Sequence, residues 1–215
     1  MTRDIPIRFA PEDAAIRANA FFALARAFDL PAKWPENFGD LLRASFSATD
    51  ASAADHAAAL ADTVEAEADR ESIMRAHSRL FLGPFTVSAP PWAAFYLDPE
   101  QKLLGPVSEY AARAYIEAGL APSAERTEAP DHIAHELEFM YFLAFEEANS
   151  GDAVWRSRQA RFWRDHLGQW LPRLARQIGT EAGDSRYYVD LAMLAATFSD
   201  WVGAQLGGPE TTPAN

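Results

Sequence analysis

Residues 129–148 read APDHIAHELEFMYFLAFEEA, and the side-chain pattern of this stretch decides the fold class. We expect a helix from Pro130 to about Ala148, because proline suits a first helical turn and no helix breaker follows. Its apolar stripe is Ile133, Leu137, Met140 and Ala144, and its further aromatic residues are Phe139, Tyr141, Phe142 and Phe145. A helix that is apolar around most of its circumference is buried at the centre of a bundle. The polar residues at its amino end would then lie at the edge of a surface shared with neighbouring elements.

The rest of the chain continues the helical period and has few strand signals. Further helices are predicted over residues 11–30, 35–46, 50–68, 69–82, 106–117, 153–178 and 184–206, with an interruption of the 153–178 helix near Gly168 and Pro172. These segments predict an all-α protein, a single helical-bundle domain of about eight to eleven helices over residues 11–206. Residues 1–10 would be an N-terminal extension, 120–130 a polar hinge linker, and 207–215 a flexible tail.

Composition excludes several classes of function. The 215 residues include no cysteine, which excludes disulfides and iron–sulfur ligation and suits a reducing compartment. The formal net charge of −12, without a Lys/Arg-rich stripe, argues against nucleic-acid binding and favours cationic partners. The first residues lack the apolar segment of a secretory signal, and no run of about 18 apolar residues predicts a membrane span. We therefore expect a cytoplasmic protein without stable membrane insertion.

The amino end of the central helix raises the question of a metal site. On the predicted helix His132 and Glu136 share a face, as do Asp131 and His135, because each pair is four residues apart. A helical metal-dependent hydrolase using His132, His135 and Glu136 is therefore the alternative function. The order His-x-x-His-Glu differs from the His-Glu-x-x-His of zinc proteases, however, and the chain has no Glu-x-x-His motif of di-iron bundles. No metal site is expected, and Asp131 and His132 also suit an ordinary polar helix start.

Residues 83–104, GPFTVSAPPWAAFYLDPEQKLL, interrupt the helical pattern. Four prolines and one glycine exclude a long helix here, while the segment gathers Phe85, Trp92, Phe95 and Tyr96. Loops longer than about 12 residues are often functional, and Trp and Tyr offer rigid apolar surface with a polar edge. Two interpretations stay open: the aromatics plug the loop onto the core, or they recognise a peptide that is cationic at one end and apolar further along.

Three segments in this order carry a resemblance to a known family. They are HSRLFLGPFTVSAPPWAAFYLDPEQKLLG at 77–105, YIEAGLAPSAERTEAPDHIAHELEFMYFL at 115–143, and FWRDHLGQWLPRLARQI at 162–178 with YYVDLAMLAATFSDW at 187–201. Over about residues 10–206 the chain resembles the TorD/DmsD family of redox-enzyme maturation chaperones, with NarJ-type proteins as more distant relatives. The resemblance implies a cytosolic all-helical protein that is not an enzyme and has no cofactor of its own.

The resemblance also implies a partner and a site. The partner would be the twin-arginine leader and apo-subunit of a DMSO-reductase-family molybdoenzyme, whose cofactor insertion is assisted and whose export is delayed. The implied leader-binding residues are Pro90, Pro91, Trp92, Tyr96, Asp98, Asp131 and His132. The two aspartates would pair with guanidinium groups, and the two aromatics would cover the apolar stretch or stack on an arginine. On this basis Asp131→Ala and Trp92→Ala are expected to weaken leader binding and to leave melting largely intact.

Assembly and further ligands follow from the resemblance as well. Family members can exchange halves between protomers, so we expect a monomer or a swapped dimer with the 120–130 linker as the hinge. Weak guanine-nucleotide binding is implied for some members, but this chain has no phosphate loop to support it. The family's small Gly-Ser pair after the tryptophan is replaced by Ala93 and Ala94, which removes a hydroxyl able to bond the leader backbone. The sequence leaves open which molybdoenzyme is served.

Overall fold

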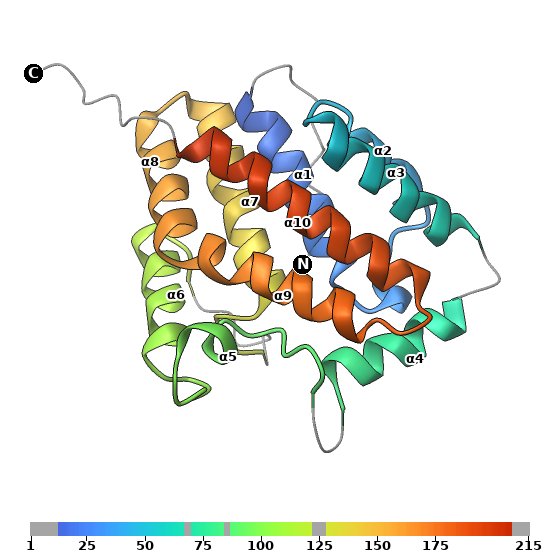
Figure 1. Ribbon diagram of the computed structural model, residues 1–215. Helices are drawn as coiled ribbons and strands as arrows, with labels where there is room; N and C mark the ends of the chain where they lie inside the picture. Colours follow the sequence, from blue (N-terminus) through green and yellow to red (C-terminus); the bar gives the residue numbers. More distant parts are fainter. Residues whose placement is uncertain (1–12, 67–69, 84–86, 122–127, 208–215) are drawn as a thin grey trace, which may run out of the picture.

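A computed structural model describes residues 13–66, 70–83, 87–121 and 128–207, and within these ranges the protein is all-helical (Figure 1). Its α-helices are α1 Asp13–Ala27, α2 Phe38–Phe46, α3 Ala51–Glu65, α4 Arg70–Phe81, α5 Ala94–Leu97, α6 Pro106–Glu117, α7 Ile133–Ser150, α8 Ala153–Phe162, α9 Gly168–Glu181 and α10 Arg186–Leu206. A 3-10 turn covers Pro31–Lys33, and a π-helical turn covers Trp163–Leu167. The all-α prediction is confirmed. The predicted N-terminal extension and, beyond Gly207, the predicted tail lie outside the described residues.

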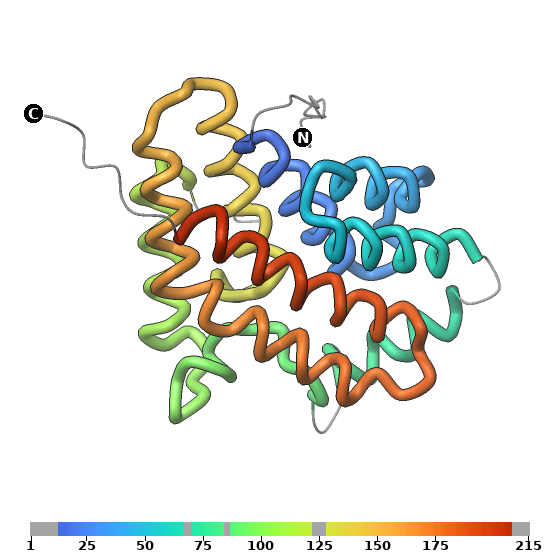
Figure 2. The backbone as a smooth tube through the Cα atoms, turned by 45° about the horizontal axis from the view of Figure 1, so that its top comes forward, coloured from blue at the N-terminus to red at the C-terminus, as the bar shows by residue number. Residues whose placement is uncertain are grey.

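The predicted apolar stripe of α7 is buried, but Tyr141, Phe142 and Phe145 are only half-buried, so α7 is not enclosed on all sides as expected. Helix α7 packs along α1, and in Figure 1 α10 crosses in front of α1, which it contacts, while packing mainly on α3 and α9. Helix α1 can approach α7 closely because most of its buried side chains are alanines, and Phe22 packs against Tyr141 of α7 with ring centroids 5.3 Å apart. Figure 2 shows α9 and α10 running side by side and joined by a tight turn. None of the helices described is long and apolar enough to cross a membrane.

Some helix boundaries differ from those predicted from the sequence. The predicted 153–178 helix is interrupted by the π-helical turn, which ends just before Gly168. A Cβ at residue 168 would lie 2.7 Å from the carbonyl oxygen of Trp163, so this close approach requires glycine. Pro172 lies inside α9 and does not end it, contrary to the expected second break. Helix α2 begins at Phe38, three residues later than expected, and the Pro-rich loop contains the short helix α5.

Candidate functional site

The Pro-rich loop and the start of α7 are joined by a short antiparallel pairing. Trp92 and His132 form an isolated β-bridge. On either side of it the Ala93 amide donates to the Asp131 carbonyl at 3.0 Å, and the Ile133 amide donates to the Pro91 carbonyl at 2.9 Å. The two segments that carry the predicted site therefore lie directly against each other.

Asp131 holds the loop in place from inside the protein. Its carboxylate is fully buried, and both oxygens accept hydrogen bonds. Oδ2 accepts from the Ala94 amide at 3.0 Å, and Oδ1 accepts from the Ser108 hydroxyl of α6 at 2.6 Å. The expected pairing of Asp131 with a ligand guanidinium would require these bonds to break. In this structure the residue positions the loop against α6 and α7.

His132 caps α7 and forms part of the same wall. Its Nδ1 accepts from the Ala134 amide at 3.3 Å, and its ring meets the Trp92 ring edge-on with centroids 5.8 Å apart. Burial, together with the neighbouring His135, lowers the pKa of His132 to about 3. The imidazole is therefore neutral at neutral pH. Because His132 is the cap, α7 begins at Ile133 and not at Pro130 as predicted.

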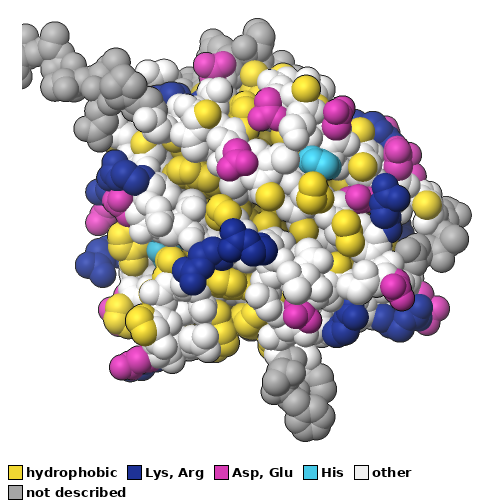
Figure 3. All heavy atoms as spheres, viewed as in Figure 1, with side chains coloured by type: hydrophobic (Ala, Val, Ile, Leu, Met, Phe, Trp, Pro, Cys, Tyr) yellow, Lys and Arg dark blue, Asp and Glu magenta, His cyan; other side chains and the backbone are white. Residues whose placement is uncertain are grey.

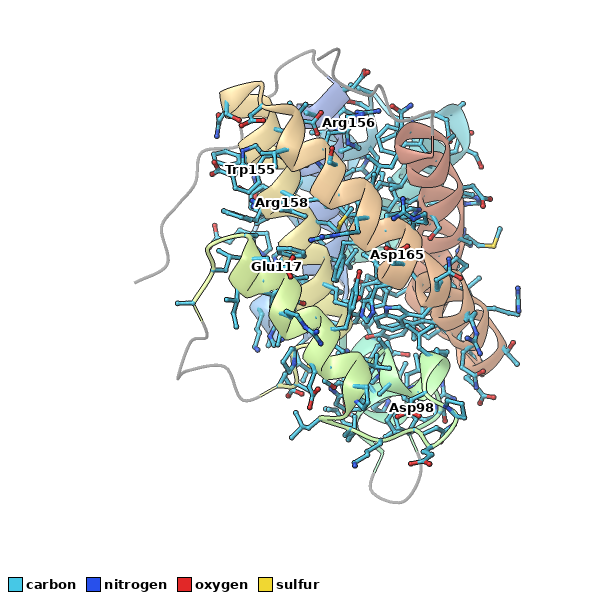
Figure 4. The ribbon with its side chains drawn as sticks, turned by 90° about the vertical axis from the view of Figure 1, so that its left-hand side faces the viewer. Asp98, Glu117, Trp155, Arg156, Arg158 and Asp165 are labelled. Carbon is cyan, nitrogen blue, oxygen red and sulfur yellow. The ribbon has the colours of Figure 1, made fainter. Side chains whose placement is uncertain are left out.

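Two of the predicted residues lie further along the loop. Tyr96 stacks on Trp170 of α9 with ring centroids 5.5 Å apart, and Arg173 donates to the Tyr96 carbonyl. The Tyr96 hydroxyl is buried without a hydrogen-bond partner, and burial raises its pKa. Asp98 closes the next turn by accepting from the Glu100 amide at 2.9 Å, and it lies below α6 on the flank shown in Figure 4. Neither side chain lines the pocket beside Trp92 and His132.

A pocket of about 410 Å³ opens beside the bridge. Its wall is built from the end of α1, the 3-10 turn, the end of α4, the loop and the start of α7. Of the predicted site residues, Pro91, Trp92 and His132 line it, whereas Pro90, Tyr96, Asp98 and Asp131 do not. The pocket has an apolar part that includes Phe28 and Phe81. Its charged part includes Arg26, Asp29, Lys33, Glu128 and Glu138.

The contribution of α1 and α4 was missed by the sequence analysis. Arg26 Nη1 lies 2.9 Å from Asp29 Oδ2, and Arg26 Nη2 donates to Glu138 Oε1 of α7. Burial raises the pKa of the Asp29 carboxyl, although Arg26 acts in the opposite direction. His77 of α4 also lines the pocket, and burial lowers its pKa to about 4. No motif marks these residues, because Arg26 and Asp29 read as an ordinary pair at the end of a helix.

The three residues of the alternative hydrolase do not converge. Glu136 is fully buried on the core side of α7: its Oε1 lies 2.6 Å from His166 Nε2, and its Oε2 accepts from the Trp170 indole at 2.9 Å. The rings of His132 and His135 are 5.7 Å apart, on the pocket side of the helix. Within the described ranges no three His, Asp or Glu side chains are grouped to hold a metal ion. Glu136 therefore does not share a site with His132 and His135, although the sequence spacing suggested that it could.

The remaining surface is mixed in character. Figure 3 shows apolar side chains scattered between charged ones across the face of α9 and α10, among which Val189 and Met193 are exposed. On the flank in Figure 4, Arg161 of α8 pairs with Glu117 of α6 at 2.6 Å. Trp155 lies on the same flank, with the Arg158 guanidinium 4.7 Å from its ring centre. Trp155 does not line the pocket beside Trp92.

Comparison with known proteins shows the family to which this chain is similar. A family model described as "Nitrate reductase delta subunit" matches residues 47–176, which include the loop and the amino half of α7. The Tat proofreading chaperone DmsD of Salmonella typhi is 32% identical over 133 residues, which is 61% of this chain and 61% of DmsD. The chaperone protein TorD of Aliivibrio fischeri is 30% identical over 122 residues, covering 55% of this chain and 56% of TorD. The chain thus matches under two thirds of the length of these relatives.

A solved structure shares the fold. The crystal structure of a candidate redox enzyme maturation protein from Archaeoglobus fulgidus superposes with a TM-score of 0.56 at 21% identity. The match covers 91% of this chain and 98% of the other. At this identity the likeness concerns the arrangement of helices alone.

Proposed function

The chain belongs to the nitrate reductase delta subunit family, in its TorD/DmsD branch, and on this premise we propose that it is a maturation chaperone binding a twin-arginine leader in the pocket beside Trp92. The partner would be the apo-subunit of a DMSO-reductase-family molybdoenzyme. Occupying the leader while the cofactor is inserted would delay export, and this role requires a cytoplasmic protein and no catalysis. The names of the relatives support a chaperone of this type.

One observation carries the assignment of the site: the bridge between Trp92 and His132, which places both on the wall of a single pocket. A leader of this type has a basic region followed by an apolar one, and the pocket likewise has a charged and an apolar part. The formal net charge of −12 would favour encounter with the basic end. We infer that the half-buried Trp92 covers the apolar stretch of the leader.

The seven implied residues divide by position. Pro91, Trp92 and His132 would contact the leader, since they line the pocket. Pro90, Tyr96, Asp98 and Asp131 would shape the loop from behind or beside. The exchange of halves through the 120–130 linker remains a prediction, because residues 122–127 lie outside the described residues.

Leader binding is testable by fluorescence anisotropy with a labelled synthetic peptide that carries two adjacent arginines ahead of an apolar segment. Trp92→Ala is expected to weaken binding about tenfold or more, as removal of a central aromatic contact does. Trp155→Ala is the matched control, because Trp155 is also half-buried but lies on α8 away from the pocket. Far-UV circular dichroism should be unchanged in both variants.

The identity of the partner needs a second measurement. The tagged protein and its Trp92→Ala variant are used to capture proteins from the host cytosol, which are identified by mass spectrometry. A molybdoenzyme precursor that retains its leader and is lost with the variant is the expected result. If the parent binds neither the peptide nor such a precursor, the proposed function is wrong. If both tryptophan variants bind like the parent, the site is elsewhere.

A further inference from the structure

One wall of the pocket already holds a guanidinium group. Arg26, in the last turn of α1, reaches across to α7 and lies between the carboxylates of Asp29 and Glu138. All three side chains line the pocket, and Arg26 is partly exposed there. Two carboxylates would not by themselves define a ligand site. The guanidinium between them shows which chemical group the two fit.

This internal pairing is incomplete. Asp29 Oδ2 lies 2.9 Å from Arg26 Nη1, but the angles are not those of a hydrogen bond. Asp29 Oδ2 and Arg26 Nε are both buried atoms without a hydrogen-bond partner. By contrast, Arg43 on the exposed surface makes hydrogen bonds to both Asp62 and Glu65. This oxygen is buried while Arg26 is in place, and a guanidinium that took the place of Arg26 could align with it.

We propose that Arg26 occupies a guanidinium subsite formed by Asp29 and Glu138, and that an arginine of the bound peptide displaces it. This inference rests on the proposed function and names the residues that would read the basic end of the leader. Displacement exchanges one guanidinium for another, so the partly buried carboxylates of Asp29 and Glu138 have a cationic partner both before and after binding. The released Arg26 keeps an aromatic neighbour, because its Cζ already lies 5.6 Å from the centre of the Phe22 ring.

The subsite would give arginine an advantage over lysine. A planar guanidinium can donate to two carboxylates at once in fixed directions, whereas an ammonium group acts as a point charge. Arg26 also lowers the apparent affinity for every arginine peptide, because such a peptide binds only the fraction of molecules in which Arg26 has left the subsite. Peptides that are apolar but lack an arginine would leave Arg26 in place and bind only through the apolar part of the pocket.

The test compares the parent protein with Arg26→Gln, using two labelled peptides that differ only in carrying two adjacent arginines or two adjacent lysines before the apolar segment. Arg26→Gln is expected to bind the arginine peptide about fivefold tighter or more, because the internal competitor is gone. The gain for the lysine peptide should be at least about threefold smaller. Adding Asp29→Asn to Arg26→Gln should remove the gain. Arg43→Gln, which also breaks an arginine between two carboxylates, should bind both peptides as the parent does.

Each outcome has a definite meaning. If Arg26→Gln binds the arginine peptide no better than the parent, or gains equally for both peptides, the subsite is wrong while the proposed function stands. If the parent and all variants bind neither peptide, the proposed function and this inference fail together. If Arg26→Gln proves unstable in a thermal melt, Arg26→Lys replaces it. That variant keeps the charge without the two-sided geometry, and it is expected to show a smaller gain in the same direction.

Discussion

Replacing Asp131 tests whether the loop is braced from inside the protein or whether this residue touches the ligand. The Asp131 carboxylate accepts from Ala94 and from Ser108, and hydrogen bonds to a charged group contribute about 1.5–3 kcal/mol each. The variant Asp131→Ala also removes a buried charge, whose desolvation offsets part of that sum. We expect a net loss of about 2–4 kcal/mol in the free energy of unfolding. For a domain of this length that corresponds to a fall of about 4–16 °C in melting temperature.

Thermal melting and leader binding together separate the two roles. Ser108→Ala removes only the hydrogen bond that α6 donates to Asp131, at a position away from the pocket. It should lower the free energy of unfolding by about 1–2 kcal/mol. If the two hydrogen bonds to Asp131 fix the position of the loop, Ser108→Ala should also weaken leader binding several-fold, although Ser108 does not line the pocket. In a double-mutant cycle the two substitutions should be coupled by about 1 kcal/mol or more. The reasoning is refuted if Asp131→Ala melts with the parent and still abolishes leader binding, which is the outcome expected of direct contact.

Two further predictions concern neighbouring side chains. In His132→Asn the helix cap is kept but no longer titrates. The pKa of His132 is about 3 in the folded protein and about 6.5 in the unfolded chain, so the unfolded chain binds more protons below pH 6.5 and the parent loses stability as pH falls towards 3. Between pH 7 and pH 5 the parent should therefore lose about 1–2 kcal/mol more of its free energy of unfolding than His132→Asn does, as measured by urea unfolding. Equal losses in both proteins would contradict the lowered pKa. Tyr96→Phe removes the buried hydroxyl that has no hydrogen-bond partner. The stability measured by thermal melting should therefore stay the same or rise by up to about 1 kcal/mol. A fall of that size would mean that the hydroxyl is hydrogen-bonded.

The fold was largely predictable because it depends on local periodicity. The apolar stripe of residues 133–144 is sufficient to predict the buried side of α7, whereas the half-buried Tyr141, Phe142 and Phe145 show that the helix is not enclosed on all sides. The start of α7 was misplaced by three residues because the side chain of Asp131 does not cap its own helix. Its partners, Ala94 and Ser108, are distant in sequence, and no helix-start rule refers to them. Periodicity also does not reveal the π-helical turn at Trp163–Leu167 or the position of Pro172 inside α9.

The site was predictable only in part. The resemblance pointed to the loop and to the Asp-His pair, and the bridge at Trp92 brings these two segments together. The sequence could not tell which of these side chains face the pocket, because the Pro-rich loop has no period from which to read a direction. Nor could it assign Arg26 and Asp29, which come from the other end of the chain. Their place in the pocket follows from the packing of α1 on α7, a tertiary contact that no motif encodes.

The polar residues at the start of α7 and just before it have two roles, because some hold the Pro-rich loop in place and others line the pocket. The first role gives a reason for the burial of a second carboxylate, that of Glu136. Glu136 accepts from the Trp170 indole, and Tyr96 stacks on that same indole, so Glu136 helps to hold the far end of the loop. Burying a carboxylate costs several kcal/mol before its partners compensate, so its benefit must be sought in the geometry that it fixes. Here Asp131 fixes the loop at Ala94, and Glu136 fixes it near Tyr96 through Trp170. If a leader binds as proposed, a loop held at both ends would lose little conformational freedom, so more of the contact free energy would appear as affinity.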